Sequence, residues 1–414
     1  MKKFITHWTF AFVTLVVLTY IGLQEPFVKE ILKLKSFDIL IQQEEKELSK
    51  DIGIVTIDEK SIEKYGQWPW SRDVIAEVIT DLRRAGAGVI MIPILFSEED
   101  RLGGDDILSQ TLIDNGVVIA QVGTSQINKN SVPRGVAKIG NPLPYLFEWD
   151  GMLGPIPKLG QNANGVGVIN TAPEIDGVVR RIPLIMRIGQ DTYPTMAVEV
   201  IRVATGNPSY QVKAGDGGVQ AIRVPGFPII NTDPNARIWL HWNKTFETIS
   251  ASENDFSKFN ARTVIIGMTA EGLGGIIATP VGEQYDYMLS ASTLQTMIDG
   301  KQINRYDVSS FLELVLSFVL GILVILIARF TPYWFVGLSL LSLYGMSVYG
   351  SYYLFNQHLI LSDISWIIIV ITIVGMHSIF NRFILEFKLK QQIRKQFETY
   401  LDPRQVAELR KDPS

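Results

Sequence analysis

The chain has no cysteine among its 414 residues. This absence excludes disulfide bonds, thiol nucleophiles and zinc–thiolate sites. Histidine is also scarce, with four residues scattered along the chain, so we expect no metal site. The net charge is only −4, which gives no reason to expect a nucleic-acid partner.

The common signatures of nucleotide and metal chemistry are missing too. The sequence has no Gly-x-x-x-x-Gly-Lys-(Ser/Thr) loop, no Gly-x-Gly-x-x-Gly motif after a strand and no His-Glu-x-x-His motif. A Ser/His/Asp triad is disfavoured, because His241 is the only histidine in the long polar region. The sequence therefore predicts no catalytic residue and no cofactor within this chain.

What the chain does have is four apolar stretches, at Phe4–Leu23, Phe311–Ala328, Trp334–Phe355 and Leu359–Phe380. About 20 apolar residues suffice for a helix to span a bilayer core. We predict one transmembrane helix within residues 1–23, behind a short cytoplasmic tip, and three more at 311–328, 334–355 and 359–380. The first stretch could instead be a cleaved signal peptide, although Tyr20–Gln24 lacks a small-x-small cleavage site.

Basic residues near the ends of these stretches predict the orientation. Lys2 and Lys3 precede the first stretch, Arg329 follows the second, and a basic cluster begins at Arg382 after the fourth. The short loop 356–358 has neither Lys nor Arg. Both termini are thus expected in the cytoplasm, and residues 24–306 outside it.

The polar region alternates apolar runs with helical patterns. Buried strands are expected at 52–57, 89–96, 117–122 and 263–268, and helices at 72–85, 105–114, 194–204 and 288–298. Continuous apolar strands separated by helices are typical of a parallel sheet covered on both faces. Segments 166–170 and 178–188 flank Glu174-Ile-Asp-Gly177, which predicts a hairpin. The expected fold is α/β, mainly parallel, with an antiparallel insertion and four transmembrane helices.

Open α/β sheets bind ligands at the carboxyl ends of their strands. The candidate ligand-binding residues near those ends are Asp58, Glu59, Trp68, Trp70, Arg72, Ser97 and Thr269. The two tryptophans could instead cap the core, and the two carboxylates could belong to a solvated loop or a helix cap. Arg180 and Arg181 could bind an anion or lie on a solvated strand edge.

Several segments resemble the CHASE2 family of extracellular sensor domains between about Asp51 and Tyr306. They are Asp51–Ser61, Gly66-Gln-Trp-Pro-Trp-Ser-Arg72, Ile94-Leu-Phe-Ser-Glu98, Asp176-Gly-Val-Val-Arg-Arg-Ile-Pro183, Tyr193-Pro194, Gly267–Leu273 and Ala278-Thr-Pro280. The resemblance implies a bacterial receptor with an unidentified extracytoplasmic ligand or protein partner. The chain departs from the family pattern at Pro93, where Asp is usual, and at Met288 and Ser290, where Glu and His are usual.

The tail, residues 381–414, continues as a helical pattern in which Leu385, Leu389, Ile393 and Phe397 recur every four residues. Asp402-Pro403 would start another helix. The string Lys395-Gln-Phe-Glu-Thr-Tyr-Leu-Asp-Pro-Arg-Gln-Val-Ala-Glu-Leu409 resembles the segment that joins the last span to the catalytic domain in class III adenylate/guanylate cyclases. That resemblance implies an output domain after Ser414, with any Mg or Mn bound there.

The expected protein is a multi-pass receptor of the bacterial cell (inner) membrane. The cyclase resemblance also implies a homodimer. Its sensor would control cyclic nucleotide synthesis. Two alternatives stay open. The same sensor could drive a kinase or a diguanylate cyclase, although a histidine kinase would need a His that 381–414 lacks. The chain could also be a stand-alone sensor or scaffold without an enzyme.

Overall fold

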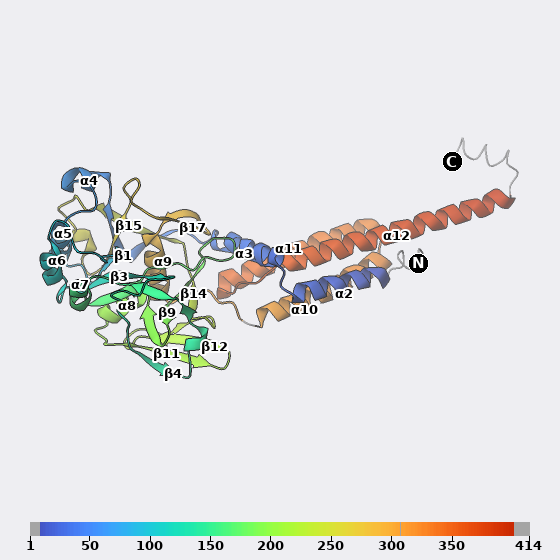
Figure 1. Ribbon diagram of the computed structural model, residues 1–414. Coiled ribbons are helices and arrows are strands. Elements are labelled where there is room, and N and C mark those ends of the chain that lie inside the picture. The colour runs from blue at the N-terminus through green and yellow to red at the C-terminus, as the bar shows by residue number, and fades with distance from the viewer. Residues whose placement is uncertain (1–8, 307, 401–414) are drawn as a thin grey trace. The chain divides into compact units, whose positions relative to one another are not determined.

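The computed structural model describes residues 9–306 and 308–400 (Figure 1). The chain divides into two compact units. Residues Asp38–Asn304 form an α/β unit. The described residues before Asp38 and after Asn304 form a helical unit.

The α/β unit is built on a sheet with the strand order β15-β1-β16-β2-β3-β6, in which β7 also pairs with β3. The strands are β1 (Glu47–Ile57), β2 (Ile90–Ile92), β3 (Val117–Thr124), β6 (Gly151–Leu153), β7 (Gly165–Val168), β15 (Lys244–Ser250) and β16 (Thr263–Met268). Every pairing is parallel except that of β3 with β6. The central strands are buried on both faces, which explains their unbroken apolar runs. The predicted mainly parallel α/β fold is confirmed.

Helices of this unit are α4 (Glu59–Tyr65), α5 (Arg72–Arg84), α6 (Asp105–Leu112), α7 (Pro157–Asn162), α8 (Met196–Ala204) and α9 (Tyr287–Asp299). Helix α5 shows why they form. Ile75, Val78, Ile79 and Leu82 recur on one face and are buried. Arg83 and Arg84 occupy the last turn, where their positive charges interact favourably with the helix dipole. Helix α8 begins two residues later than predicted, because Asp191–Pro194 forms strand β10.

Smaller sheets surround the central one. They are β10-β9-β5, β13-β12-β11-β4, β14-β8 and β17-β18. Their strands are β4 (Val136–Ile139), β5 (Phe147–Glu148), β8 (Arg181–Pro183), β9 (Ile185–Ile188), β10 (Asp191–Pro194), β11 (Tyr210–Gly215), β12 (Gly218–Arg223), β13 (Ile230–Asn231), β14 (Arg237–Trp239), β17 (Ile276–Thr279) and β18 (Gly282–Tyr285). Short 3₁₀ turns lie at Leu143–Tyr145 and Ser257–Phe259.

The predicted hairpin around Glu174–Gly177 is wrong. The turn itself exists, with Gly177 at φ 79°, but its flanking strands pair elsewhere. Strand β7 is buried throughout and joins the parallel sheet beside β3, whereas β8 pairs with β14. Burial of an apolar strand on two faces outweighs a local hairpin pairing. An antiparallel insertion is nevertheless present, in the β9–β10 hairpin around Gly189.

The helical unit contains α2 (Thr9–Leu23), α10 (Ser309–Phe330), α11 (Tyr333–His358) and α12 (Ser365–Tyr400), together with most of α3 (Phe27–Ile41). By length and apolarity, α10 and residues 365–396 of α12 could each cross a membrane. The α2–α3 pair, bent by 78°, could supply a third span. The four predicted spans are thus not all confirmed, because the glycines, serines and tyrosines of α11 dilute its apolar character.

The start of the last span also differs from the sequence-based prediction. The last span begins at Ser365 rather than Leu359, because Leu359 ends α11 in the left-handed conformation at φ 52°. Asp363 then starts α12, since its Oδ1 accepts hydrogen bonds from the backbone N–H and the hydroxyl of Ser365 at 2.8 and 2.5 Å. Helix α3 was not expected at all. The predictions that rest on Lys2, Lys3 and Asp402-Pro403 lie outside the described residues.

Helices α2, α10 and α12 pack side by side in the helical unit (Figure 1). Their shared core contains Leu15 of α2 and Val370, Ile371 and Val374 of α12. Gly321 of α10 faces Leu15 so closely that a methyl group there would collide with the leucine side chain. Small residues allow such close helix contacts in membranes.

Candidate functional site

Three polar residues lie together at the carboxyl ends of β1, β15 and β16, namely Asp58, Ser250 and Thr269. Asp58 and Thr269 are among the predicted ligand-binding residues, and Ser250 is not. Asp58 caps α4, and its Oδ1 accepts hydrogen bonds from the Ser61 N–H at 3.0 Å and from the Ser250 hydroxyl at 2.7 Å. Thr269 lies alongside, because its N–H donates to the Ile57 carbonyl at 2.9 Å. Partial burial would raise the pKa of Asp58, but the hydrogen bonds from Ser250 and Ser61 outweigh it and hold this pKa below its usual range.

Glu59 belongs to the same group. Its Oε1 accepts a hydrogen bond from the Glu271 N–H at 2.8 Å, which ties α4 to the loop after β16. The Tyr285 hydroxyl donates to the Thr269 carbonyl in that loop at 3.4 Å. Asp58, Glu59 and Thr269 therefore share one edge of the sheet. Glu59 is solvent-exposed, while Asp58 and Thr269 are half-buried.

Arg72, the first residue of α5, belongs to a second cluster, which it forms with the loop that follows β2. Its side chain donates to the Glu98 carbonyl at 2.8 Å, lies 3.4 Å from Asp105, and stacks 4.5 Å above the Phe96 ring. Ser97, half-buried, is in the same loop. The Arg72 guanidinium thus holds the loop after β2 against the start of α5.

Asp100 completes this second cluster. Its carboxylate accepts hydrogen bonds from the backbone N–H groups of Arg72, Leu102 and Gly104 at 2.9, 3.0 and 2.9 Å. Burial would raise the pKa of Asp100, but these three donors and the charge of Arg72 lower it. A loop tied by three backbone donors is well ordered, so this cluster forms a fixed wall beside the sheet edge.

The two tryptophans belong to the hydrophobic core. Trp70 is buried and its Nε1 donates to the Gly66 carbonyl at 2.8 Å. The half-buried Trp68 lies edge-on to Trp70, with 5.4 Å between ring centroids, and the Trp68–Pro69 peptide bond is cis. Tyr65 of α4 packs on Trp70 at 5.2 Å. This cluster therefore connects α4 to the start of α5 rather than presenting two free aromatic faces.

Ser290, one of the departures from the family pattern, lies at a different place. It lines a small cavity of about 10 Å³ between the end of β7 and the starts of α8 and α9, together with Asn170 and Thr195. This volume holds about one water molecule. In the sheet, β7 is three pairings away from β16, so Ser290 does not join the Asp58 group.

The sequence did not reveal the role of Arg180. Its side chain is fully buried and binds two carboxylates, each at two points. The Nε and Nη2 atoms lie 2.6 and 2.7 Å from the oxygens of Asp38, and Nη1 and Nη2 lie 2.8 Å from those of Asp176. Burial would lower the pKa of Arg180, but the hydrogen bonds and charges of Asp176 and Asp38 outweigh it and raise this pKa.

Both expectations for the arginine pair are corrected. Arg180 is neither on a solvated edge nor available to an external anion, because its donors are saturated from within the chain. Arg181 binds Glu174 at 2.6 and 2.8 Å and stacks 4.8 Å above Trp239. The four-residue spacing of Asp176 and Arg180 was the signal available in the sequence. The third partner, Asp38, is 142 residues away from Arg180.

A further polar cluster lies in the helical unit, where the chain leaves and re-enters it. Arg305 donates to Glu313 of α10 at 2.5 and 2.8 Å and to the Leu361 carbonyl at 3.1 Å. The same guanidinium lies 5.4 Å from the centroid of the Phe37 ring, in α3. Glu313 also accepts a hydrogen bond from the Asp363 N–H at 2.7 Å. One arginine thus joins α3, α10 and the segment before α12.

Across the part of the chain that the structure describes, no group of three or more His, Asp or Glu side chains could hold a metal ion. The site chemistry consists of carboxylates, hydroxyls and one arginine, most of which bind each other. Such an arrangement suits noncovalent recognition at the exposed carboxylate of Glu59 and the half-buried hydroxyl of Thr269.

A mainly parallel α/β unit joined in the chain to apolar helices of membrane-spanning length defines a membrane-associated protein with a large polar domain. The family model of the CHASE2 domain matches residues 11–328. The chain therefore belongs to the CHASE2 family of sensor domains. The match includes nearly all of α2 and of α10, so the family pattern covers apolar helices as well as the α/β unit. No curated protein and no solved structure matches the chain.

Proposed function

We propose that this protein is a multi-pass receptor of the bacterial inner membrane, with the α/β unit outside and both termini in the cytoplasm. The four spans would be α2, α10, α11 and α12. Helix α11 has 26 residues without Asp, Glu, Lys or Arg, and at 1.5 Å per residue it is about 39 Å long, enough for the hydrocarbon core. Arg329 in the last turn of α10 and the basic residues of α12 support this orientation.

The observation that carries the proposal is the continuity of α12. It runs as a single helix from Ser365 to Tyr400, through the apolar span and into the basic tail. Arg382 binds carbonyls of Ala328 and Thr331 at the end of α10, so the remainder of α12 extends beyond that end. A shift or rotation of the span would therefore pass directly to whatever follows the tail.

The sensing site in this proposal is the sheet edge formed by Asp58, Glu59 and Thr269, with Ser97 in the adjoining loop. Trp68, Trp70 and Arg72 would shape and stiffen the wall of that edge. An extracytoplasmic ligand or protein would act by binding one conformation of the receptor more tightly than the other. Two polar clusters, Asp38–Arg180–Asp176 and Arg305–Glu313, lie in or beside the segments through which the chain passes between its units.

The output we propose is a class III adenylate or guanylate cyclase, active as a homodimer, with its Mg or Mn ions in the catalytic domain. The likeness of residues 395–409 to the cyclase connector supports this choice over a kinase or a diguanylate cyclase. Reading the gene past Ser414 tests it first. A following cyclase domain, with cyclic nucleotide made by membranes that contain the protein, would support it; a different output domain or an immediate stop codon would refute it.

The sensing edge is tested separately. The receptor with its output domain is first exposed to culture extracts, and one that raises cyclic nucleotide synthesis is chosen as the stimulus. The double substitution Glu59→Gln and Thr269→Val should abolish the response to that extract while leaving the synthesis without extract unchanged. Glu77→Gln, an exposed carboxylate on α5, is the matched control. An unchanged response in the double variant would show that the signal binds elsewhere.

A further inference from the structure

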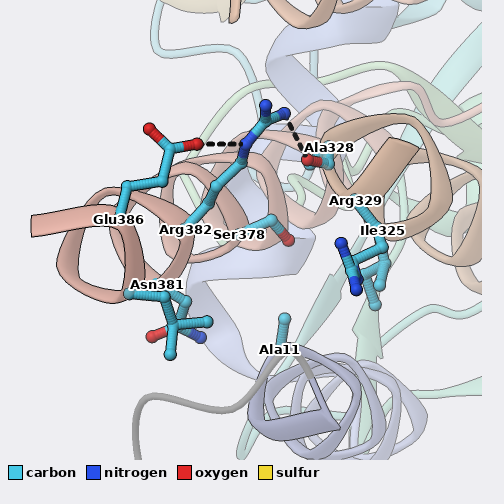
Figure 2. Close-up of a pocket in the computed structure, with 9 residues that line it drawn as sticks. Ala11, Ile325, Ala328, Arg329, Ser378, Asn381, Arg382 and Glu386 are labelled. Carbon is cyan, nitrogen blue, oxygen red and sulfur yellow. Dashed lines mark hydrogen bonds and ion pairs between the residues drawn. The ribbon is translucent and has the colours of Figure 1, made fainter. Parts of the chain in front are cut away.

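A polar cavity lies among three helices of the helical unit, near the C-terminal end of α10 (Figure 2). Its volume is about 360 Å³. Residues of α2, α10 and α12 surround it, namely Ala11, Ile325, Ala328, Arg329, Ser378, Asn381, Arg382, Leu385 and Glu386. The basic residues of the sequence predict that this end of the helices faces the cytoplasm.

Asn381 is the unusual member of this lining. Only 3% of its surface is exposed, and among the described residues nothing accepts a hydrogen bond from its Nδ2 group. Leaving a buried amide without a hydrogen-bond partner is destabilising, so the position of Asn381 calls for a partner. In Figure 2 it borders the same space as Ser378 and Ala11. A group with acceptor oxygens inside the cavity would supply that partner.

Two guanidinium groups from different helices give this cavity its charge. Arg382 of α12 donates to Glu386 at 2.9 Å and to the Ala328 carbonyl at 3.1 Å (Figure 2). It also binds the Thr331 carbonyl. Arg329 of α10 is exposed at the rim. Two arginines against one carboxylate leave a net positive charge. Lys388 and Lys390 are exposed further along α12 and add to it.

We infer that this cavity binds the phosphate of an anionic phospholipid headgroup. Arginine forks and an amide donor match phosphate oxygens, and basic pockets between transmembrane helices on the cytoplasmic side are typical sites for such headgroups. The lipid rather than free phosphate is indicated by an apolar groove of about 440 Å³ lined by Tyr333, Met376, Ile379, Phe380 and Phe383. Arg382 stacks 4.5 Å above Tyr333, so it contacts both the polar cavity and the groove.

The test uses the full chain in a neutral detergent, titrated with phosphatidylglycerol, with phosphatidylcholine and with inorganic phosphate, and followed by native mass spectrometry. Phosphatidylglycerol should bind at least about tenfold more tightly than phosphatidylcholine, because one charge-assisted hydrogen bond alone is worth about that factor. Inorganic phosphate should bind far more weakly than the lipid, because it leaves the groove empty.

Two substitutions locate the site. Arg329→Gln removes a rim charge from an exposed side chain, so folding is spared, and Asn381→Leu fills the cavity with an apolar group. Each should weaken phosphatidylglycerol binding about tenfold, whereas Arg329→Lys should retain most of it. Lys388→Gln, which removes the same charge outside the cavity, should change the affinity less than twofold.

Equal affinity for the two lipids would overturn the inference, as would equal losses for Arg329→Gln and Lys388→Gln. Binding of inorganic phosphate as tight as that of phosphatidylglycerol would overturn the lipid assignment. The inference needs only a membrane-embedded helical unit. A negative result would therefore leave the proposed sensing function and its output untouched.

Discussion

Asp38 and Arg180 form a two-point ion pair of 2.6 and 2.7 Å across 142 residues of sequence. Asp38 lies near the end of α3, a helix that starts at Phe27 in the helical unit, and Arg180 lies in the core of the α/β unit. The pair therefore fastens the last turn of α3 to the α/β core. This is the first fixed point of the sensor after the chain enters it.

Arg180→Met should destabilise the α/β unit strongly. It would leave Asp38 and Asp176 buried without their cation, and breaking a buried pair from one side costs about 3–5 kcal/mol. Pulse proteolysis of the full chain in urea measures the free energy of unfolding. Arg187→Met is the matched control, because the Arg187–Glu148 pair has the same close geometry but a half-exposed carboxylate. It should cost about 1 kcal/mol or less, and equal costs for both variants would contradict our account.

Acid should weaken the α/β unit partly through Glu174. Burial would raise the pKa of this carboxyl, but the hydrogen bond and charge of Arg181 outweigh it and lower the pKa below its ordinary value of 4.5. The folded chain thus keeps this carboxylate ionised at lower pH than the unfolded chain does. Its stabilisation is complete above pH 4.5 and is lost as the pH falls through the lower, folded-state pKa.

Urea midpoints measured between pH 6 and pH 3 test this linkage. Glu174→Gln should lower the midpoint at pH 6 and flatten its fall towards pH 3, because the variant has no carboxyl to protonate at this position. Glu77→Gln, at an exposed carboxylate, should keep the wild-type slope. If the Glu174 variant fell as steeply as the wild type, the ion pair with Arg181 would not contribute as described.

Arg305→Gln should loosen the start of α10 and the segment before α12. The substitution removes the ion pair with Glu313 and the contact with the Leu361 carbonyl. Amide hydrogen exchange of the full chain should increase at 305–313 and 361–365, by about tenfold or more if the pair contributes 1.4 kcal/mol or more. Arg329→Gln at the other end of α10 should leave those peptides unchanged.

Gly321→Val should disrupt the contact of α10 with α2. Its side chain would overlap Leu15, and overpacking of this kind costs about 1–3 kcal/mol. Gly337→Val of α11 is the control, because no atom lies within 4 Å of a Cβ built there. Thermal stability in detergent should fall for the first variant and not for the second. Equal stability would show that α2 and α10 do not meet at these residues.

Much of the central sheet follows from local pattern. The apolar runs at 117–122 and 263–268 and the one-sided periodicity of 72–85 predicted β3, β16 and α5 within two residues at each end. Burial on both faces of a strand leaves an unbroken apolar run, and burial on one face of a helix leaves a periodic pattern. The tail likewise showed its helical spacing, and α12 runs without a break to Tyr400.

What could not be predicted depends on distant partners. Nothing near Gly177 shows that β7 pairs with β3 rather than with β8, because register and partner are decided across the sheet. From the sequence alone, Arg180 is expected to be exposed, as most arginines are. It is buried because Asp38, which is distant in the sequence, pairs with it. Helix α3 combines five charged residues with its apolar face, so it resembles neither a span nor a strand. The position of Asp58 at the carboxyl edge of the sheet could be predicted from the strand pattern. Its hydrogen bond with Ser250 could not, because the two residues are 192 apart in the sequence.

The central claim is that the α/β unit lies on the extracytoplasmic side of the membrane and the tail on the cytoplasmic side. Cysteine accessibility tests it most directly. The chain has no cysteine, so each single substitution is read against a clean background. Glu253→Cys and Lys388→Cys replace exposed residues of the α/β unit and of α12. In intact spheroplasts a membrane-impermeant maleimide should label the first and reach the second only after lysis. Labelling of Lys388→Cys before lysis, with Glu253→Cys protected, would contradict the account.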